Sequence, residues 1–176
     1  MSGSVYTIRR ARPADADVLS KLGPTTFRET FGNEFPAAAI DARMALVYAP
    51  ERLRLDLGDP WQAWFLAQAG ESTIGFLALG GGTAPDCVSG PGPLELSRLY
   101  LRADWHGRGP AFALMETGLE EAAARGAGTL WLQAWERNAK ALAFYRAHGF
   151  RQVGNVPVPF ASRELPHAVL VRPVLP

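Results

Sequence analysis

The chain has 176 residues, 48% hydrophobic and 20% charged, which suits a globular protein with one sizeable core. We expect residues 1–176 to form a single domain. The net charge of +1 argues against a dedicated nucleic-acid-binding protein, which would carry a basic excess. No apolar run approaches the ~18 residues that cross a bilayer, so we expect no membrane partner.

Cysteine and histidine point to no redox or metal chemistry. Cys87 is the sole cysteine, so no internal disulfide can form, and it is expected to be an incidental thiol. Three histidines are too scattered to predict a metal site: His106, His148 and His167. No apolar segment follows the arginines near the N-terminus, so a secretory signal is not expected and a cytoplasmic location is.

The N-terminal part predicts a strand followed by helices. Val5–Arg10 alternates and is rich in β-forming residues, which indicates a strand. Asp15 and Asp17 open a helix that continues to Phe31, and Gly23-Pro24 predicts a break or kink within it.

Ala37–Tyr48 predicts a second helix. Glu51–Leu57 is ambiguous, because its leucines alternate as in a strand, but Pro50 before it and Gly58 after it favour a helix. A β-hairpin is expected next, formed by Trp61–Gln68 and Ser72–Leu79.

The C-terminal half predicts alternating strands and helices. Gly80–Pro93 is rich in glycine and proline and is expected to be a loop, followed by a strand over Leu94–Arg102. Gly109–Arg125 has the apolar spacing of a helix, Leu130–Trp135 reads as a buried strand, and Asn138 caps a helix that stops at Gly149. The closing strands are expected at Phe150–Gly154 and His167–Val174. This order predicts an α/β (α+β) fold: a mixed sheet with a central β-α-β crossover and helices on both faces.

The strand-to-helix turn at 106–111, HGRGPA, is the first candidate for chemistry. An apolar strand runs into Gly107 and Gly109, and a long helix begins there, which leaves backbone N–H groups at a helix N-terminus available to phosphate. Arg108 adds a cation, and Pro110 is tolerated in a first helical turn. An ordinary tight turn would share these features, because a lone Gly-x-Gly pattern has low specificity.

Two longer segments make the pattern specific. LYLRADWHGRGPAFALM (99–115) resembles motif A of the GCN5-related N-acetyltransferase (GNAT) superfamily, whose signature is R/Q-x-x-G-x-G/A. LWLQAWERNAKALAFYRAHGF (130–150) resembles motif B of that family, with N-x-x-A-x-x-F-Y and G-F. The similarity is concentrated in about residues 94–154, and Thr25–Phe31 is similar to a segment of polyamine-type members.

The resemblance implies a mostly antiparallel sheet of six to seven strands and acetyl-CoA as co-substrate, with no metal. The pyrophosphate would be wrapped by Gly107, Arg108, Gly109, Pro110 and Ala111, and Asn138 would also touch the cofactor. His106 stands where the family has Arg or Gln and would take the place of that residue at the cofactor. The pantetheine arm would pair with backbone groups of Leu99, Tyr100 and Leu101, one of which would polarise the thioester carbonyl.

The same resemblance places the cofactor in a splayed cleft between the strands at 94–102 and 130–136. A small-molecule amine, or a peptide or protein amine, would enter from the other side. That side would be formed by about residues 25–48, the 80–93 loop and the 155–166 segment. Family members often dimerise, so a homodimer is an open expectation.

Two residues are candidates for proton transfer. Tyr145 would protonate the departing CoA thiolate, although simple packing against the sheet is the alternative. Glu95 lies eleven residues before His106, where some histone-acetylating members carry their catalytic glutamate. Its apolar neighbours are expected to raise its pKa, as suits a base. The alternative for Glu95 is a solvated residue or an ion pair with Arg98, and lesser candidates for the base are Glu34 and Glu136.

Two other functions compete with acetyl transfer. A dinucleotide-binding oxidoreductase also uses a strand–Gly-x-Gly–helix unit, but Phe112 occupies the place of its third glycine. A non-catalytic CoA-binding protein of the same fold is the second alternative. The acceptor stays open among polyamine, amino acid, antibiotic, peptide N-terminus and protein lysine.

Overall fold

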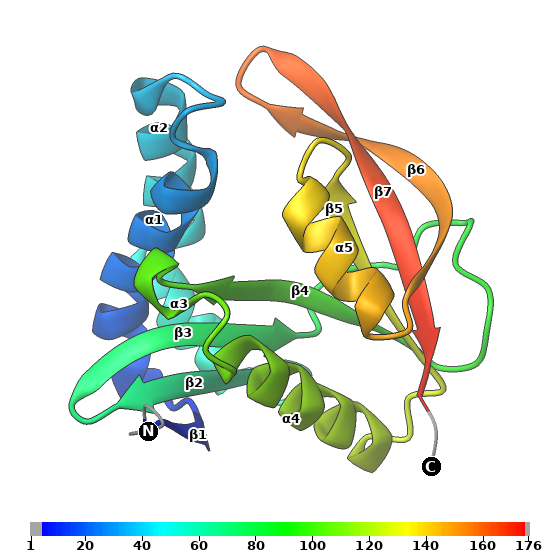
Figure 1. Cartoon of the computed structure of the whole chain (residues 1–176), viewed down its shortest axis with the longest axis horizontal. Coiled ribbons are helices and arrows are strands. Elements are labelled where there is room, and N and C mark those ends of the chain that lie inside the picture. The colour runs from blue at the N-terminus through cyan, green and yellow to red at the C-terminus, as the bar shows by residue number, and fades with distance from the viewer. Residues whose placement is uncertain (1–4, 175–176) are drawn as a thin grey trace. The chain divides into compact units, whose positions relative to one another are not determined.

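The computed structural model describes residues 5–174, which form seven strands, five α-helices and two short 3-10 helices (Figure 1). The chain divides into two compact units. The first contains the residues up to Leu79 together with Arg98–Gly118, and the second contains Gly80–Ser97 and the residues from Leu119 onward. The boundary after Ser97 lies within the strand Pro93–Leu101, and the boundary after Gly118 lies within the helix Pro110–Ala124.

In the first unit, three strands pair as antiparallel neighbours. β1 (Thr7–Arg10) pairs with β2 (Ala63–Ala69), and β2 pairs with β3 (Ser72–Leu79), which confirms the predicted hairpin. The other elements of this unit are η1 (Pro13–Asp15), α1 (Ala16–Phe31), α2 (Ala37–Val47), α3 (Pro50–Gly58), the end of β4 (Pro93–Leu101), η2 (Ala103–Trp105) and the start of α4 (Pro110–Ala124). The ambiguous leucine-rich segment is the helix α3: Leu53 is fully buried, whereas Leu55 is exposed.

Of the predicted break or kink at Gly23-Pro24, the break is wrong, because α1 runs through both residues without interruption. Gly23 serves packing instead: a Cβ there would lie 2.2 Å from Cε1 of Tyr48, at the end of α2. Beside the proline, Thr26 Oγ1 donates to the carbonyl of Leu22 at 3.0 Å. Tertiary packing therefore overrides the local tendency of this dipeptide to end a helix.

Helices cover both faces of the sheet within the first unit. Phe76 on β3 meets the ring of Tyr48, with centroids 6.0 Å apart. Its neighbour Leu77 lies on the other face, where a Cβ on Gly118 of α4 would be 3.0 Å from Leu77 Cδ1. The predicted two-sided cover is thus confirmed for this unit.

In the second unit, the start of β4 pairs in parallel with β5 (Thr129–Trp135), with Leu94 opposite Leu130. β5 pairs antiparallel with β7 (Arg163–Pro173), and β7 pairs antiparallel with β6 (Arg151–Phe160). Because parallel strands need a crossover, α4 is the helix of the predicted β-α-β unit. α5 (Ala139–Ala147) follows β5. The strand order β1-β2-β3-β4-β5-β7-β6 confirms a mixed, mostly antiparallel sheet with seven strands.

The closing strands are longer than the sequence predicted. The 155–166 segment, which lies between the two predicted strands, belongs almost entirely to β6 and β7, and these strands meet at a tight turn where Ala161 has a φ of 53°. The segment contains several prolines, and two of them, Pro157 and Pro166, face each other across the ladder. β6 is the last strand in the order, and an edge strand tolerates residues that lack an N–H. Among residues 5–174, no helix combines the length and apolar character needed to cross a membrane.

Candidate functional site

The predicted site residues divide between the two units. Leu99–Ala111 lie in the first unit, whereas Glu95, Asn138 and Tyr145 lie in the second. Within the described part of the chain, no three His, Cys, Asp or Glu side chains gather in the way that a metal ion would require.

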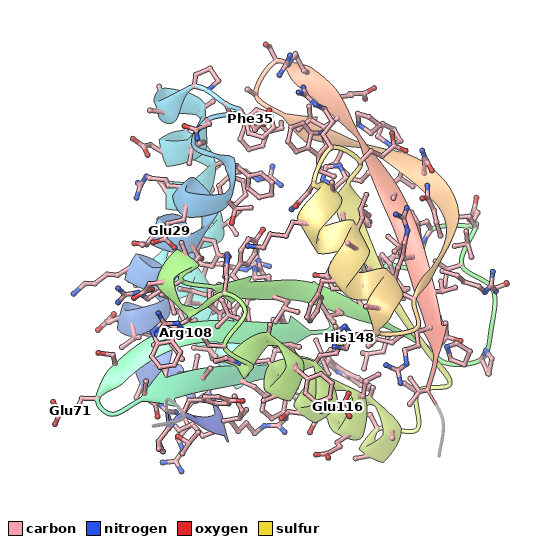
Figure 2. All side chains as sticks on the ribbon, viewed as in Figure 1. Glu29, Phe35, Glu71, Arg108, Glu116 and His148 are labelled. Carbon is pink, nitrogen blue, oxygen red and sulfur yellow. The ribbon has the colours of Figure 1, made fainter. Side chains whose placement is uncertain are left out.

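The segment that joins β4 to α4 is anchored where it begins. The amide of Arg102 donates to the carbonyl of Ile74 on β3 at 2.9 Å. The amide of Ala103 donates to Oε2 of Glu29 on α1 at 2.8 Å, and Figure 2 labels this glutamate. η2 then bends the backbone, with the Trp105 amide donating to the Arg102 carbonyl at 3.0 Å. The turn that follows therefore starts from a rigid position.

Two glycines shape the turn before α4. Gly107 has a φ of 73° and Gly109 a φ of 103°, a region that residues with a Cβ rarely adopt. Among residues 5–174, the amides of Gly107, Gly109 and Ala111 donate to no acceptor. A Cβ on Gly107 would meet nothing within 4 Å, so this part of the turn is open to a ligand. These amides stand at the N-terminal end of a 15-residue helix, where backbone N–H groups and the helix dipole favour a negatively charged ligand.

The side chains of the turn have different roles. Arg108, labelled in Figure 2, lies over the ring of Trp105 with its Cζ 5.7 Å from the centroid. It is exposed and has no carboxylate partner within the described residues, so its charge is available to an anion. His106 instead turns back: its Nε2–H donates to the carbonyl of Leu101 at 3.1 Å. This bond ties the histidine to the turn's own backbone. Pro110 is buried at the first position of α4, as expected for a proline at a helix start.

The end of β4 carries the predicted pantetheine strand. The ring of Tyr100 packs against Phe76 and Phe27, with centroid distances of 5.7 Å and 6.3 Å. Burial raises the pKa of Tyr100, so its phenol stays neutral. Leu101 is 7% exposed and lies against Gly75, where a Cβ would be 2.4 Å from Leu101 Cδ2. Aromatic and aliphatic packing therefore holds this part of the strand in place.

In the second unit, Glu95 lies on β4 opposite Trp131 of β5. Its carbonyl accepts a hydrogen bond from the Gly80 amide at 2.7 Å. Its carboxylate lies so close to Gly82 that a Cβ there would come within 2.1 Å of Oε2. The glycine-rich loop thus packs directly on Glu95, which explains why this part of the loop needs glycine.

The Asn138 cap of α5 is confirmed. Oδ1 of Asn138 accepts a hydrogen bond from the Ala141 amide at 3.1 Å. Its Nδ2 group has no partner among residues 5–174 and can serve a second contact. The capping role and the predicted cofactor contact are therefore compatible.

Tyr145 is held in one orientation on α5. It is 9% exposed, and its ring meets Phe150 edge-on with centroids 5.7 Å apart. The Phe150 amide donates to the Tyr145 carbonyl at 3.1 Å, just after Gly149 ends the helix with a φ of 81°. Arg172 closes this helix end by donating to the carbonyl of His148 at 2.7 Å (Figure 2 labels His148). Packing and a role in proton transfer both fit this geometry.

The two lesser candidates for the base differ in their surroundings. Glu34 lies exposed in the turn after α1. Glu136, just after β5, accepts a hydrogen bond from Nδ2 of Asn155 on β6. His167 is nearby: burial lowers its pKa, while its bond to the Leu165 carbonyl and the charge of Glu136 act in the opposite direction.

The sequence reasoning missed the aromatic surroundings of Arg98. The Cζ of Arg98 lies 4.9 Å from the ring centroid of Trp64 and 5.7 Å from that of Tyr48. Arg98 therefore contacts these two rings in place of the Glu95 carboxylate that the sequence analysis considered as its partner. The arginine directly before the apolar stretch Leu99–Leu101 was the one signal available beforehand, because its partners come from distant parts of the chain.

The sequence matches the acetyltransferase (GNAT) family over residues 25–150. An N-acetyltransferase of Mycobacterium tuberculosis, itself uncharacterized, is 33% identical over 141 residues, which cover 78% of this chain and 83% of that protein. A further uncharacterized N-acetyltransferase, from Lactobacillus delbrueckii subsp. lactis, is 27% identical over 124 residues, covering 70% and 72% of the two chains.

Solved structures have the same fold. The PaiA N-acetyltransferase of Thermoplasma acidophilum, solved with coenzyme A, matches with a TM-score of 0.76 at 17% identity and covers 96% of this chain and 99% of its own. The structure of yncA from Salmonella typhimurium, solved with acetyl-CoA, has a TM-score of 0.68 at 17% identity and covers 98% and 96%. With both predicted motifs inside the matched region, the chain belongs to the acetyltransferase (GNAT) family.

Proposed function

We propose that this protein transfers an acetyl group from acetyl-CoA to a primary amine, directly and within a ternary complex. The observation that carries the proposal is the set of unpaired amides at Gly107, Gly109 and Ala111, at the N-terminus of α4. Three donors pointing from a helix start suit a diphosphate, and the exposed guanidinium of Arg108 supplies a matching charge. In this proposal, residues 1–176 act as one domain.

The remaining contacts are assigned to the same cofactor. Backbone groups of Leu99, Tyr100 and Leu101 pair with the pantetheine arm, and Nδ2 of Asn138 is a further donor. His106 contributes by holding the turn through the Leu101 carbonyl rather than by reaching the phosphates. Pro110 supplies no N–H, but its φ suits the first position of the helix.

The chemistry requires two proton transfers and a polarised carbonyl. Acetyl-CoA supplies the acetyl thioester, whose C–S bond breaks as the C–N bond to the amine forms. A backbone N–H of β4 stabilises the developing negative charge on the carbonyl oxygen. Glu95 accepts the proton that the amine must lose, and Tyr145 donates a proton to the departing sulfur. Holding both reactants together supplies much of the acceleration.

Glu95 is preferred as the base over Glu34 and Glu136. The loop at Gly82 packs against its carboxylate, so the group is held in one place. Glu136 is engaged with Asn155, and Glu34 lies on an exposed turn. A cytoplasmic location and a homodimer remain predictions.

The alternative is a non-catalytic CoA-binding protein of the same family. Two measurements separate it from the enzyme: calorimetric titration with acetyl-CoA, and thiol release from acetyl-CoA over a panel of amines. Binding together with amine-dependent thiol release is the expected result. Binding without release by any amine or peptide would favour the alternative, and the absence of binding by folded protein at millimolar acetyl-CoA would refute both.

A further inference from the structure

Arg98 lies on a rigid platform of aromatic rings in the first unit. The platform consists of Tyr48, Trp64, Phe76 and Tyr100. Trp64 and Phe76 are stacked, with an interplanar angle of 18°, and both are almost fully buried. Tyr48 is 4% exposed and fits into the notch left by Gly23. The half-buried guanidinium therefore has a defined position before any ligand binds.

The charge of Arg98 is not neutralised by the protein. A guanidinium has five N–H donors, and among residues 5–174 the hydroxyl of Tyr48 accepts a hydrogen bond from this one. Burial raises the pKa of Tyr48 and of Tyr100, so both phenols stay protonated and neither acts as a counter-anion. No carboxylate of the described residues pairs with Arg98. Cation–π contacts offset part of the cost of partial burial but leave the other N–H groups of Arg98 without acceptors among residues 5–174.

This environment favours an anionic ligand with two oxygens. The planar guanidinium matches a carboxylate with two parallel hydrogen bonds. Arg98 also directly precedes Leu99–Leu101, the backbone proposed to hold the pantetheine arm beside the thioester. A group bound by Arg98 would therefore belong to the acceptor.

We propose that Arg98 binds the carboxylate of the acceptor and that the acceptor class is an amino acid with a free carboxylate close to its amine. The inference rests on the proposed function and is independent of which residue serves as the base. It also opposes the polyamine expectation, because a fixed guanidinium repels a second ammonium group.

The test compares acceptors that differ only at the carboxylate. L-phenylalanine, L-phenylalaninamide and phenethylamine form one such set, L-methionine and its amide form a second, and spermidine represents the polyamines. For each, kcat/KM is calculated on the concentration of unprotonated amine, which removes differences in amine basicity. We expect the wild-type protein to favour the free carboxylate by about 10- to 100-fold, the range for a hydrogen-bonded charged group.

Variants then assign the preference to Arg98. Arg98→Gln is expected to abolish it and Arg98→Lys to retain part of it, because lysine keeps the charge but loses the planar pair of donors. Arg10→Gln is the matched control, since Arg10 also lies over a ring, Phe65, at 5.5 Å, but on β1. This control should keep the wild-type preference.

A binding measurement separates the inference from the proposed function. Calorimetry of L-phenylalanine and phenethylamine with the wild-type protein saturated with CoA needs neither turnover nor a variant. Carboxylate-dependent binding without any turnover would support the Arg98 site while the enzymatic proposal fails. Equal binding and equal turnover of the two compounds, a preference for spermidine, or an unchanged preference in folded Arg98→Gln would overturn the inference and leave N-acetyl transfer intact.

Discussion

Gly107→Ala tests the proposed diphosphate site with little risk to the fold. The φ of Gly107 is 73°, and a Cβ there would meet nothing within 4 Å, so backbone strain is the only expected cost to the unliganded protein. Gly109 is less suitable, because a Cβ there would lie 2.8 Å from the hydroxyl of Tyr6. Gly70 offers a matched control: its φ is 57°, it also has nothing within 4 Å, and it lies between β2 and β3.

The two substitutions should cost similar stability but very different affinity. A residue with a Cβ in the left-handed region costs roughly 1–2 kcal/mol, which corresponds to a fall in Tm of about 2–8 °C for a chain of this size. In Gly107→Ala, the methyl group also keeps the phosphate from approaching the amides. Losing one charge-assisted hydrogen bond costs about 1.5–3 kcal/mol, so the Kd for CoA should rise about 10- to 100-fold.

The assay is calorimetric titration of CoA into each variant, with thermal unfolding measured in parallel. We expect both variants to melt earlier than the wild-type protein and only Gly107→Ala to bind CoA more weakly. Wild-type affinity in Gly107→Ala, with the same loss of Tm as Gly70→Ala, would refute the idea that these amides hold the diphosphate.

Tyr145→Phe should lower kcat more than it raises KM for acetyl-CoA, and unchanged turnover in steady-state kinetics would remove the phenol from the mechanism. Glu95→Gln should flatten the alkaline-rising limb of kcat/KM against pH, and a wild-type profile would assign the base elsewhere. Gly23→Ala should lower the free energy of unfolding by at least about 2 kcal/mol in urea, because the buried tyrosine ring beside it must shift, whereas Gly58→Ala, with nothing within 4 Å, should not. The pKa of His167 is below its ordinary value of 6.5 in the folded state, so the unfolded chain binds its proton more readily. The free energy of unfolding should therefore keep its full value above pH 6.5 and fall at lower pH. In His167→Gln, the urea midpoint should lose this part of its pH dependence.

Local sequence patterns predicted most of the elements and the site motifs. Asn138 was recognised as a cap, and the glycines at 107 and 109 as a turn before a helix, because these features depend on a few consecutive residues. Predictions failed where distant residues decide the outcome. Pro24 lies inside a continuous helix, and Pro157 inside a strand, because packing and the edge position in the sheet compensate for the missing N–H groups.

The sequence by itself determined the family, the order of the elements and the place of the glycine turn before α4, since all of these depend on residues close together in the chain. Only the tertiary structure decided the surroundings of Arg98. Its platform joins side chains from the end of α2, from β2, β3 and β4, so no local pattern could reveal it. The charge left on that guanidinium follows from burial, which keeps the neighbouring phenols protonated, and burial is a property of the folded chain alone.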